Sequence, residues 1–175
     1  TLNNATPVGD YPITIGTITD PNGVYNLNFT SKNYKVVARN LTLQASQIAQ
    51  ISKVYGQADN LASSVSTGYN EDTLAVLYTR STGDTVGTYN LLTATINEVN
   101  NNYGTITIAA NAGNGKFTIT QKEATLSWGN NVFTYSGENQ WPVATVTNLE
   151  SGDTCTVSVS GAQINYSASA YTATA

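Results

Sequence analysis

The sequence predicts an all-β protein made of tandem small β modules, each an Ig-like sandwich or a β-grasp-like sheet, with little helix. Three observations support this prediction. Apolar and polar residues alternate along most of the chain, which is typical of half-buried strands. Turn-forming Gly, Asn and Asp residues separate the alternating runs. A run that opens on a tyrosine recurs at Tyr11, Tyr89 and Tyr171, which indicates internal repeats.

The predicted strands are rich in Thr and β-branched residues, which suit a pleated surface. In chain order the alternating runs are residues 11–18, 25–30, 73–78, 103–110, 116–120, 144–149, 154–160 and 171–175. Turn motifs begin at Asp20, Ser81, Asn111, Gly129 and Glu150. These motifs divide the chain into short strands and favour sheets over helices.

Two segments show some helical character. Residues 43–54 have apolar positions that fit neither period, so we expect a linker that ends in a strand. Residues 59–68 are predicted to form a single helical turn. Both segments are short, so helix is a minor component of the predicted fold.

The repeats are found by overlaying two pairs of stretches. The first pair begins at Val8 and Val86, and its closing strands are residues 40–44 and 116–120. The second pair matches Tyr55 with Tyr135 and the Asp-Thr pairs at positions 72–73 and 153–154. Both overlays give a period of about 80 residues, as in modular arrays.

This period predicts three divisions of the chain. Residues 1–45 are the back half of a repeat module, residues 46–121 a complete module, and residues 122–175 the front half of a following module. The tyrosines within the repeats, Tyr11, Tyr55, Tyr89 and Tyr135, recur at fixed places and are expected to be structural.

An ordered set of short motifs resembles a known family, the YGX-type MBG repeats of large bacterial surface proteins. The motifs are Val54-Tyr55-Gly56, Asp72-Thr73, Val86-Gly87-Thr88-Tyr89, Asn102-Tyr103 and the closing FTIT run. Residues 6–43 resemble the back half of the same type, and the C-terminal segment is similar to a sister repeat. The resemblance implies tandem modules of an adhesin-like or fibre-like protein outside the bacterial cell, and it carries no catalytic residues.

The predicted function is therefore a non-catalytic stalk or fibre segment of a bacterial surface adhesin. Its expected partners are neighbouring repeats or other copies, with head-to-tail assembly in which half-modules complete each other by strand exchange. The alternative is a module that itself binds a carbohydrate or a host surface protein. Trp128 and Trp141 are the candidate ligand platform for that alternative, because aromatic rings offer large contact areas.

Composition excludes several classes of function. The chain has no histidine and one cysteine, so histidine catalysis and a Cys/His zinc site are excluded, and we expect no enzyme. Its seven Lys and Arg residues are scattered singly, and the net charge is −4, which disfavours nucleic acid. No apolar run is long enough for membrane insertion, and nothing resembles a signal peptide, so we expect a mature segment.

The remaining candidates concern metals and covalent chemistry. Asp20, Asp84 and Asp153 stand in turns, but they lack the regular spacing of a calcium loop. No cofactor is therefore expected, and Ca2+ is a lesser candidate. Cys155 lies in an alternating run and is predicted to be a buried small hydrophobe. A Lys–Asn isopeptide crosslink is a lesser candidate, at Lys35 or Lys116.

Overall fold

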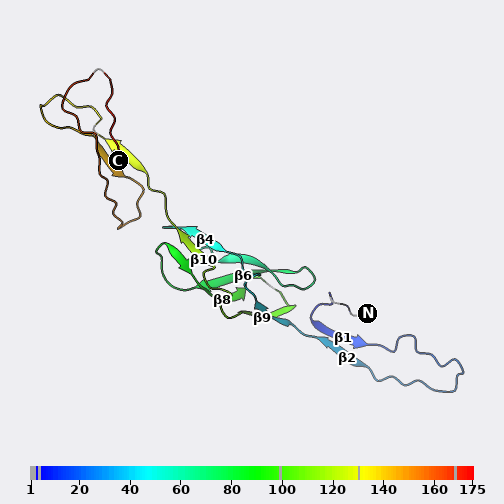
Figure 1. The fold of residues 1–175 in the computed structure, drawn as a ribbon. Helices are drawn as coiled ribbons and strands as arrows, with labels where there is room; N and C mark the ends of the chain where they lie inside the picture. The colour runs from blue at the N-terminus through cyan, green and yellow to red at the C-terminus, as the bar shows by residue number, and fades with distance from the viewer. Residues whose placement is uncertain (1–2, 4, 99, 130, 168) are drawn as a thin grey trace. The chain divides into compact units, whose positions relative to one another are not determined.

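The computed structural model describes residue 3 and residues 5–98, 100–129, 131–167 and 169–175. These residues form twelve strands and no helix, which confirms the all-β fold class (Figure 1). The strands are β1 (Gly9–Ile13), β2 (Lys32–Val36), β3 (Arg39–Leu43), β4 (Ile51–Val54), β5 (Ala62–Ser66), β6 (Thr73–Arg80), β7 (Gly87–Tyr89), β8 (Leu91–Ile96), β9 (Tyr103–Ile108), β10 (Phe117–Thr120), β11 (Leu126–Gly129) and β12 (Val143–Val146).

The chain divides into two compact units, Thr1–Thr120 and Gln121–Ala175. Within the first unit we distinguish an N-terminal segment, residues 5–37, from a central module, residues 39–120. The second unit is called the C-terminal segment, residues 121–175. Strand β3 lies within residues 1–45, which the sequence predicts to be the back half of a module. In the structure β3 pairs with β9, so we count it with the central module.

The central module contains two three-stranded sheets and one strand pair. The sheet orders are β4-β10-β7 and β5-β6-β8. Strands β3 and β9 form the pair. Strand β10 pairs in parallel with β4, and strand β9 pairs in parallel with β3. The segment β9–β10 therefore runs beside the segment β3–β4 in the same direction. The remaining pairings are antiparallel.

One continuous stretch joins the two sheets of the central module. Strands β7 and β8 are consecutive in the chain, and the chain changes sheet at Asn90, between them. The backbone of Asn90 bonds to Ser81, and its side-chain oxygen accepts the N–H of Gly115. Nearby, a Cβ on Gly113 would lie 2.2 Å from the carbonyl oxygen of Leu91, so only glycine allows this close approach.

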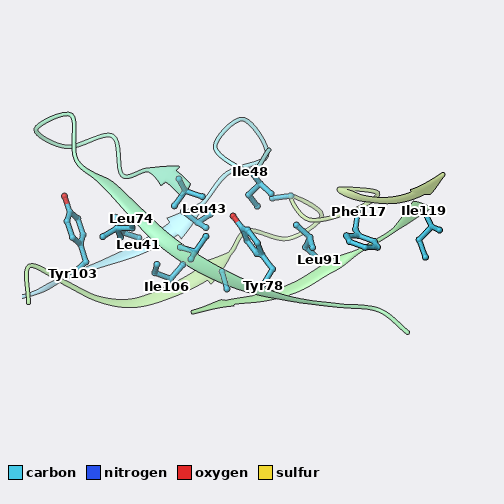
Figure 2. Packing of buried hydrophobic residues seen from close by; sticks show 14 residues of the cluster. Leu41, Leu43, Ile48, Leu74, Tyr78, Leu91, Tyr103, Ile106, Phe117 and Ile119 are labelled. Atoms are coloured by element: carbon cyan, nitrogen blue, oxygen red, sulfur yellow. The ribbon is translucent and has the colours of Figure 1, made fainter. Parts of the chain in front are cut away.

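A single hydrophobic cluster fills the central module (Figure 2). Figure 2 shows its labelled side chains in a row that runs from Tyr103 at one end to Ile119 at the other. The buried apolar residues are Leu41, Leu43, Ile48, Val65, Leu74, Val76, Tyr78, Leu91, Ala94, Tyr103, Ile106, Ala112, Phe117 and Ile119. Every one of them lies between positions 41 and 119, so the packed core belongs to the central module alone among the described residues.

Among the described residues, the two flanking segments contain strands but no buried core. In the N-terminal segment β1 and β2 form an antiparallel hairpin, and in the C-terminal segment β11 pairs with β12. No described residue of either segment is buried. The segments therefore lack the apolar packing that stabilises an isolated sheet.

Four sequence predictions differ from the structure. Residues 62–66 form β5 where a helical turn was predicted, because their backbone pairs with the buried strand β6. Residues 25–30, 154–160 and 171–175 alternate as strands do, but they form no ladder, and the last two runs share only the isolated bridge between Ser160 and Thr174. Alternation shows that a segment suits a sheet, whereas a ladder also needs a neighbouring strand. The choice between sandwich and β-grasp topology remains a prediction.

Candidate interaction surface

Four charged side chains of the central module, Lys53, Asp59, Arg80 and Asp84, form a network of ion pairs. Asp59 accepts from Lys53 Nζ at 2.8 Å and from Arg80 Nε at 2.6 Å. Asp84 accepts from the same two cations, at 3.2 Å from Lys53 Nζ and 2.8 Å from Arg80 Nη2. The guanidinium of Arg80 also lies 4.7 Å from the ring centre of Phe117. The network ties β4 and β6 to the loop before β7.

This network keeps all four side chains ionised. The hydrogen bond from Arg80 lowers the pKa of Asp59, and the hydrogen bond from Lys53 lowers that of Asp84. The hydrogen bonds to Asp59 raise the pKa of both Lys53 and Arg80. The contact between Lys53 and Asp59 is therefore an ion pair.

A second polar cluster lies inside the core. The hydroxyl of Tyr103 donates to Asp72 Oδ2 at 2.6 Å and lies 3.1 Å from Oγ1 of the buried Thr67. Burial, followed by the neighbouring carboxylate of Asp72, raises the pKa of Tyr103. The hydroxyl of Thr67 also bonds to both backbone groups of Tyr69. These contacts satisfy the buried polar atoms and lock the turn that follows β5.

The N-terminal hairpin β1–β2 shares geometry with strands β7 and β10 of the central module. The hydroxyl of Tyr11 donates to the carbonyl of Pro7 at 2.7 Å, and that of Tyr89 donates to the carbonyl of Thr85 at 2.6 Å, each four residues back. Tyr11 stands opposite Tyr34 in the β1–β2 ladder.

Tyr89 likewise stands opposite Phe117 in the β7–β10 ladder. Strand β1 therefore corresponds to β7, and β2 corresponds to β10. The sequence overlay instead matches residues 40–44 with 116–120, and that match stays a prediction. Tyr171, the third tyrosine of the set, bonds to the carbonyl of Asn165 and does not follow this spacing.

The C-terminal segment shares turn geometry with residues 55–73 of the central module. The N–H of Asp72 donates to the carbonyl of Tyr69, and the N–H of Asp153 donates to that of Glu150. Gly56 and Gly137 both have positive φ, 85° and 76°. Counting from these turns, β12 corresponds to β5, and residues 154–160 correspond to β6.

Large apolar side chains are exposed on both flanking segments. In the N-terminal segment they are Ile13, Ile15, Ile18, Val24, Tyr25, Leu27, Phe29, Tyr34 and Val37. In the C-terminal segment they are Leu126, Trp128, Val132, Phe133, Tyr135, Trp141, Val143, Leu149, Ile164, Tyr166 and Tyr171. Among the described residues, neither flanking segment buries these side chains.

The two candidate platform residues are both exposed, but they lie in different local structures. Trp128 is in β11, opposite Ala144, and is 45% exposed. Trp141 precedes β12 and is 51% exposed. The two rings make no aromatic contact with each other among the described residues, and their role as a ligand platform stays a prediction.

The other sequence candidates are placed as follows. Cys155 is an exposed free thiol, which corrects the prediction that it is buried, because residues 154–160 have no sheet to face. The carboxylate of Asp20 accepts the N–H groups of Asn22 and Tyr25, as a turn aspartate does. The ammonium group of Lys116 donates to the carbonyl of Ala45, and Lys35 is exposed in β2.

No group of three or more His, Cys, Asp or Glu residues within the described ranges has the geometry to hold a metal ion. The same residues include no helix of the length and hydrophobicity needed to span a membrane.

Comparison with known proteins returns no relative. No family model, curated protein or solved structure matches the chain.

Proposed function

We propose that the chain is a non-catalytic structural segment of a bacterial extracellular adhesin, in which modules like the central one form a stalk or fibre. Residues 39–120 are the unit that repeats in this proposal. The flanking segments are parts of adjacent units, and neighbouring repeats or other copies are the partners. The MBG resemblance of the sequence supports the bacterial cell surface as the location.

The observation that carries this proposal is the shared geometry of β1–β2 and β7–β10. The same tyrosine bond and the same tyrosine-to-aromatic pairing occur at both places. Independent segments rarely share a side-chain bond, a strand pairing and a sequence motif at once. The same structure at two places in one chain is the property that defines a modular array.

The surface chemistry suits a stalk. The chain carries 10% charged residues, and its polar surface is largely Thr, Ser and Asn. A stalk module needs a self-contained core and soluble outer faces, and the central module has both. Stalk function requires no cleft or cluster of reactive groups.

The experiment that tests the stalk function inserts one, two or three further copies of residues 39–120 into the chain after Thr120. Small-angle scattering then measures the maximum dimension of each protein. An array predicts equal increments of length and equal increments of β-sheet signal in circular dichroism. Collapse of the inserted copies into an unfolded or aggregated state would contradict the proposal.

The alternative function is recognition of a carbohydrate or a host surface protein by the C-terminal segment. The exposure of Trp128 and Trp141 favours it, because indole rings bind sugar faces and apolar protein surfaces. Glycan and matrix-protein arrays probed with the full chain, Trp128→Ala and Trp141→Ala separate the two functions. Binding that is lost in either variant supports recognition, and no binding supports the stalk.

A further inference from the structure

The first and last segments of the central module lie side by side and run in the same direction. Strand β3 pairs in parallel with β9, and at its start Arg39 stands opposite Tyr103. Farther along the chain β4 pairs in parallel with β10, and at its end Val54 stands opposite Thr120. Tyr103 and Ile119 lie at opposite ends of the core in Figure 2. The chain therefore enters the module at one end of the core and leaves it at the other.

This arrangement decides how the module responds to tension along the chain. Tension pulls β3 back toward its start and pulls β10 forward past its end. Each parallel pair is then loaded along its length. Because the hydrogen bonds of a parallel ladder are evenly spaced, they share such a load and must break together. When the same pair is pulled apart from one end, the load falls on one bond at a time.

Further hydrogen bonds reinforce both parallel pairs. Backbone bonds flank the ladders, from the N–H groups of Arg39, Ala109, Ile51 and Tyr55 to the carbonyls of Asn102, Leu43, Lys116 and Thr120 respectively, at 2.8–3.0 Å.

Side chains add bonds between the same segments. The β3–β9 register shifts near Asn40, and there the side-chain oxygen of Asn40 accepts the N–H of Thr105 at 3.0 Å. Just before β4 the side-chain amide of Gln50 donates to Oγ1 of Thr118 at 2.8 Å. Sliding of one segment past the other would break these bonds together with the ladders.

Both strands of the β4–β10 pair are also fixed to the rest of the module. Among the described residues, β4 pairs with no strand except β10, so the pairing alone would let β4 move with β10. The ion pairs of Lys53 with Asp59 and Asp84 hold β4 in place. Strand β10 carries Phe117 and Ile119, which are both buried in the core. Movement of β10 along its own direction would therefore pull two apolar side chains out of the core.

We propose that the central module bears mechanical load, and that the parallel pairs β3–β9 and β4–β10 are the elements that resist tension along the chain. This inference rests on the proposed stalk function, because a stalk transmits the pull on one of its ends through every module. The residues that carry it lie between positions 39 and 120, and the chain on either side only transmits the load. Resistance to force depends on the barrier to unfolding, so the direction of pulling should change it while the stability stays the same.

The test pulls the full chain in two directions by single-molecule force spectroscopy. Both forms carry Cys155→Ala, and handles are attached to two introduced cysteines. One form carries Val37→Cys and Gln121→Cys, which loads both parallel pairs along their length. The other carries Val37→Cys and Asn101→Cys, which lie just before β3 and β9 and pull that pair apart from one end. All three positions are exposed and lie outside the strands.

The expected result is a several-fold higher unfolding force for the form pulled from positions 37 and 121, at the same pulling speed. Its unfolding should release about 280 Å of chain contour in one step, for roughly 80 residues at about 3.5 Å each. Urea titrations of the two forms without handles should coincide, because the introduced cysteines lie outside the core. Equal unfolding forces in the two directions, or gradual extension at low force from positions 37 and 121, overturn the inference.

Failure of the load-bearing role is distinguishable from failure of the stalk function. The insertion experiment measures length without applied force, so it does not depend on the barrier to unfolding. Regular growth of the inserted forms together with equal unfolding forces would refute the load-bearing role alone. Collapse of the inserted copies together with a direction-dependent force would refute the array and leave the parallel pairs as the resistant element of a single module.

Discussion

Substitution of Phe117 by alanine tests whether the central module is the packed part of the chain. The side chain of Phe117 is fully buried. Its ring meets that of Tyr89 edge to face at 6.4 Å, and Arg80 lies over it. Truncation of a buried phenylalanine to alanine costs about 3–5 kcal/mol, since apolar contacts are lost and a cavity remains.

That loss is large for a module of this size. At about 0.05–0.15 kcal/mol per residue, a module of about 80 residues has a free energy of unfolding of roughly 4–12 kcal/mol. Phe117→Ala should therefore leave the module marginally stable. Urea titration of dilute protein, followed by circular dichroism, should show the midpoint lowered by at least about 1 M, given slopes of about 1–3 kcal/mol per M.

The matched control is Tyr34→Ala, which removes an aromatic ring from the corresponding position of the N-terminal hairpin. Because that ring is half exposed, its loss should change the free energy of unfolding by less than about 0.5 kcal/mol. The reasoning is refuted if the two variants unfold at the same urea concentration. That result would mean that the correspondence or the difference in burial is wrong.

Three further predictions concern polar groups of the central module. Tyr78→Phe should raise the free energy of unfolding by about 1 kcal/mol, because the Tyr78 hydroxyl is buried and has no hydrogen-bond partner in the described part of the chain; a lower urea midpoint would contradict this. Thr67→Val should lower it by about 1–3 kcal/mol, because the buried hydroxyl bonds to Tyr103 and to the turn; an unchanged thermal midpoint would argue against that role. Asp59→Asn should make the free energy of unfolding depend less on pH in acid. The hydrogen bond from Arg80 lowers the pKa of the Asp59 carboxyl below 3.8, so the carboxylate stabilises the folded chain fully above that pH, and this stabilisation is lost as pH falls through the folded pKa. Identical acid-unfolding curves for the Asn variant and the unsubstituted chain would exclude this contribution.

Local patterns predicted some of the paired strands, but not β2, β5 or β11. Strands β6, β9 and β10 alternate in sequence and lie in ladders of the central module. Residues 25–30 and 154–160 alternate equally well but form no strand ladder; Ser160 makes only an isolated bridge to Thr174. The difference is the availability of a neighbouring strand, which the sequence of one segment does not report.

Strand β5 was missed for the opposite reason. Its sequence, ASSVS, has one large apolar residue, Val65, and three serines. Serine has little preference for strands, so only the pairing with β6 reveals this element.

The ion-pair network was also beyond the reach of sequence patterns. Lys53, Asp59, Arg80 and Asp84 come from four places that only the folded chain brings together. By contrast, the two tryptophans were singled out from their sequence context, and both are exposed.

The central claim is that one packed module, residues 39–120, lies between two segments that have strands but no core. Amide hydrogen exchange of the dilute, full chain tests it directly, because slow exchange reports structure that opens only on unfolding. We predict that slowly exchanging amides are confined to β3–β10. Slow exchange throughout β1–β2 and β11–β12 at the same dilution, or its absence from the central module, would contradict the account.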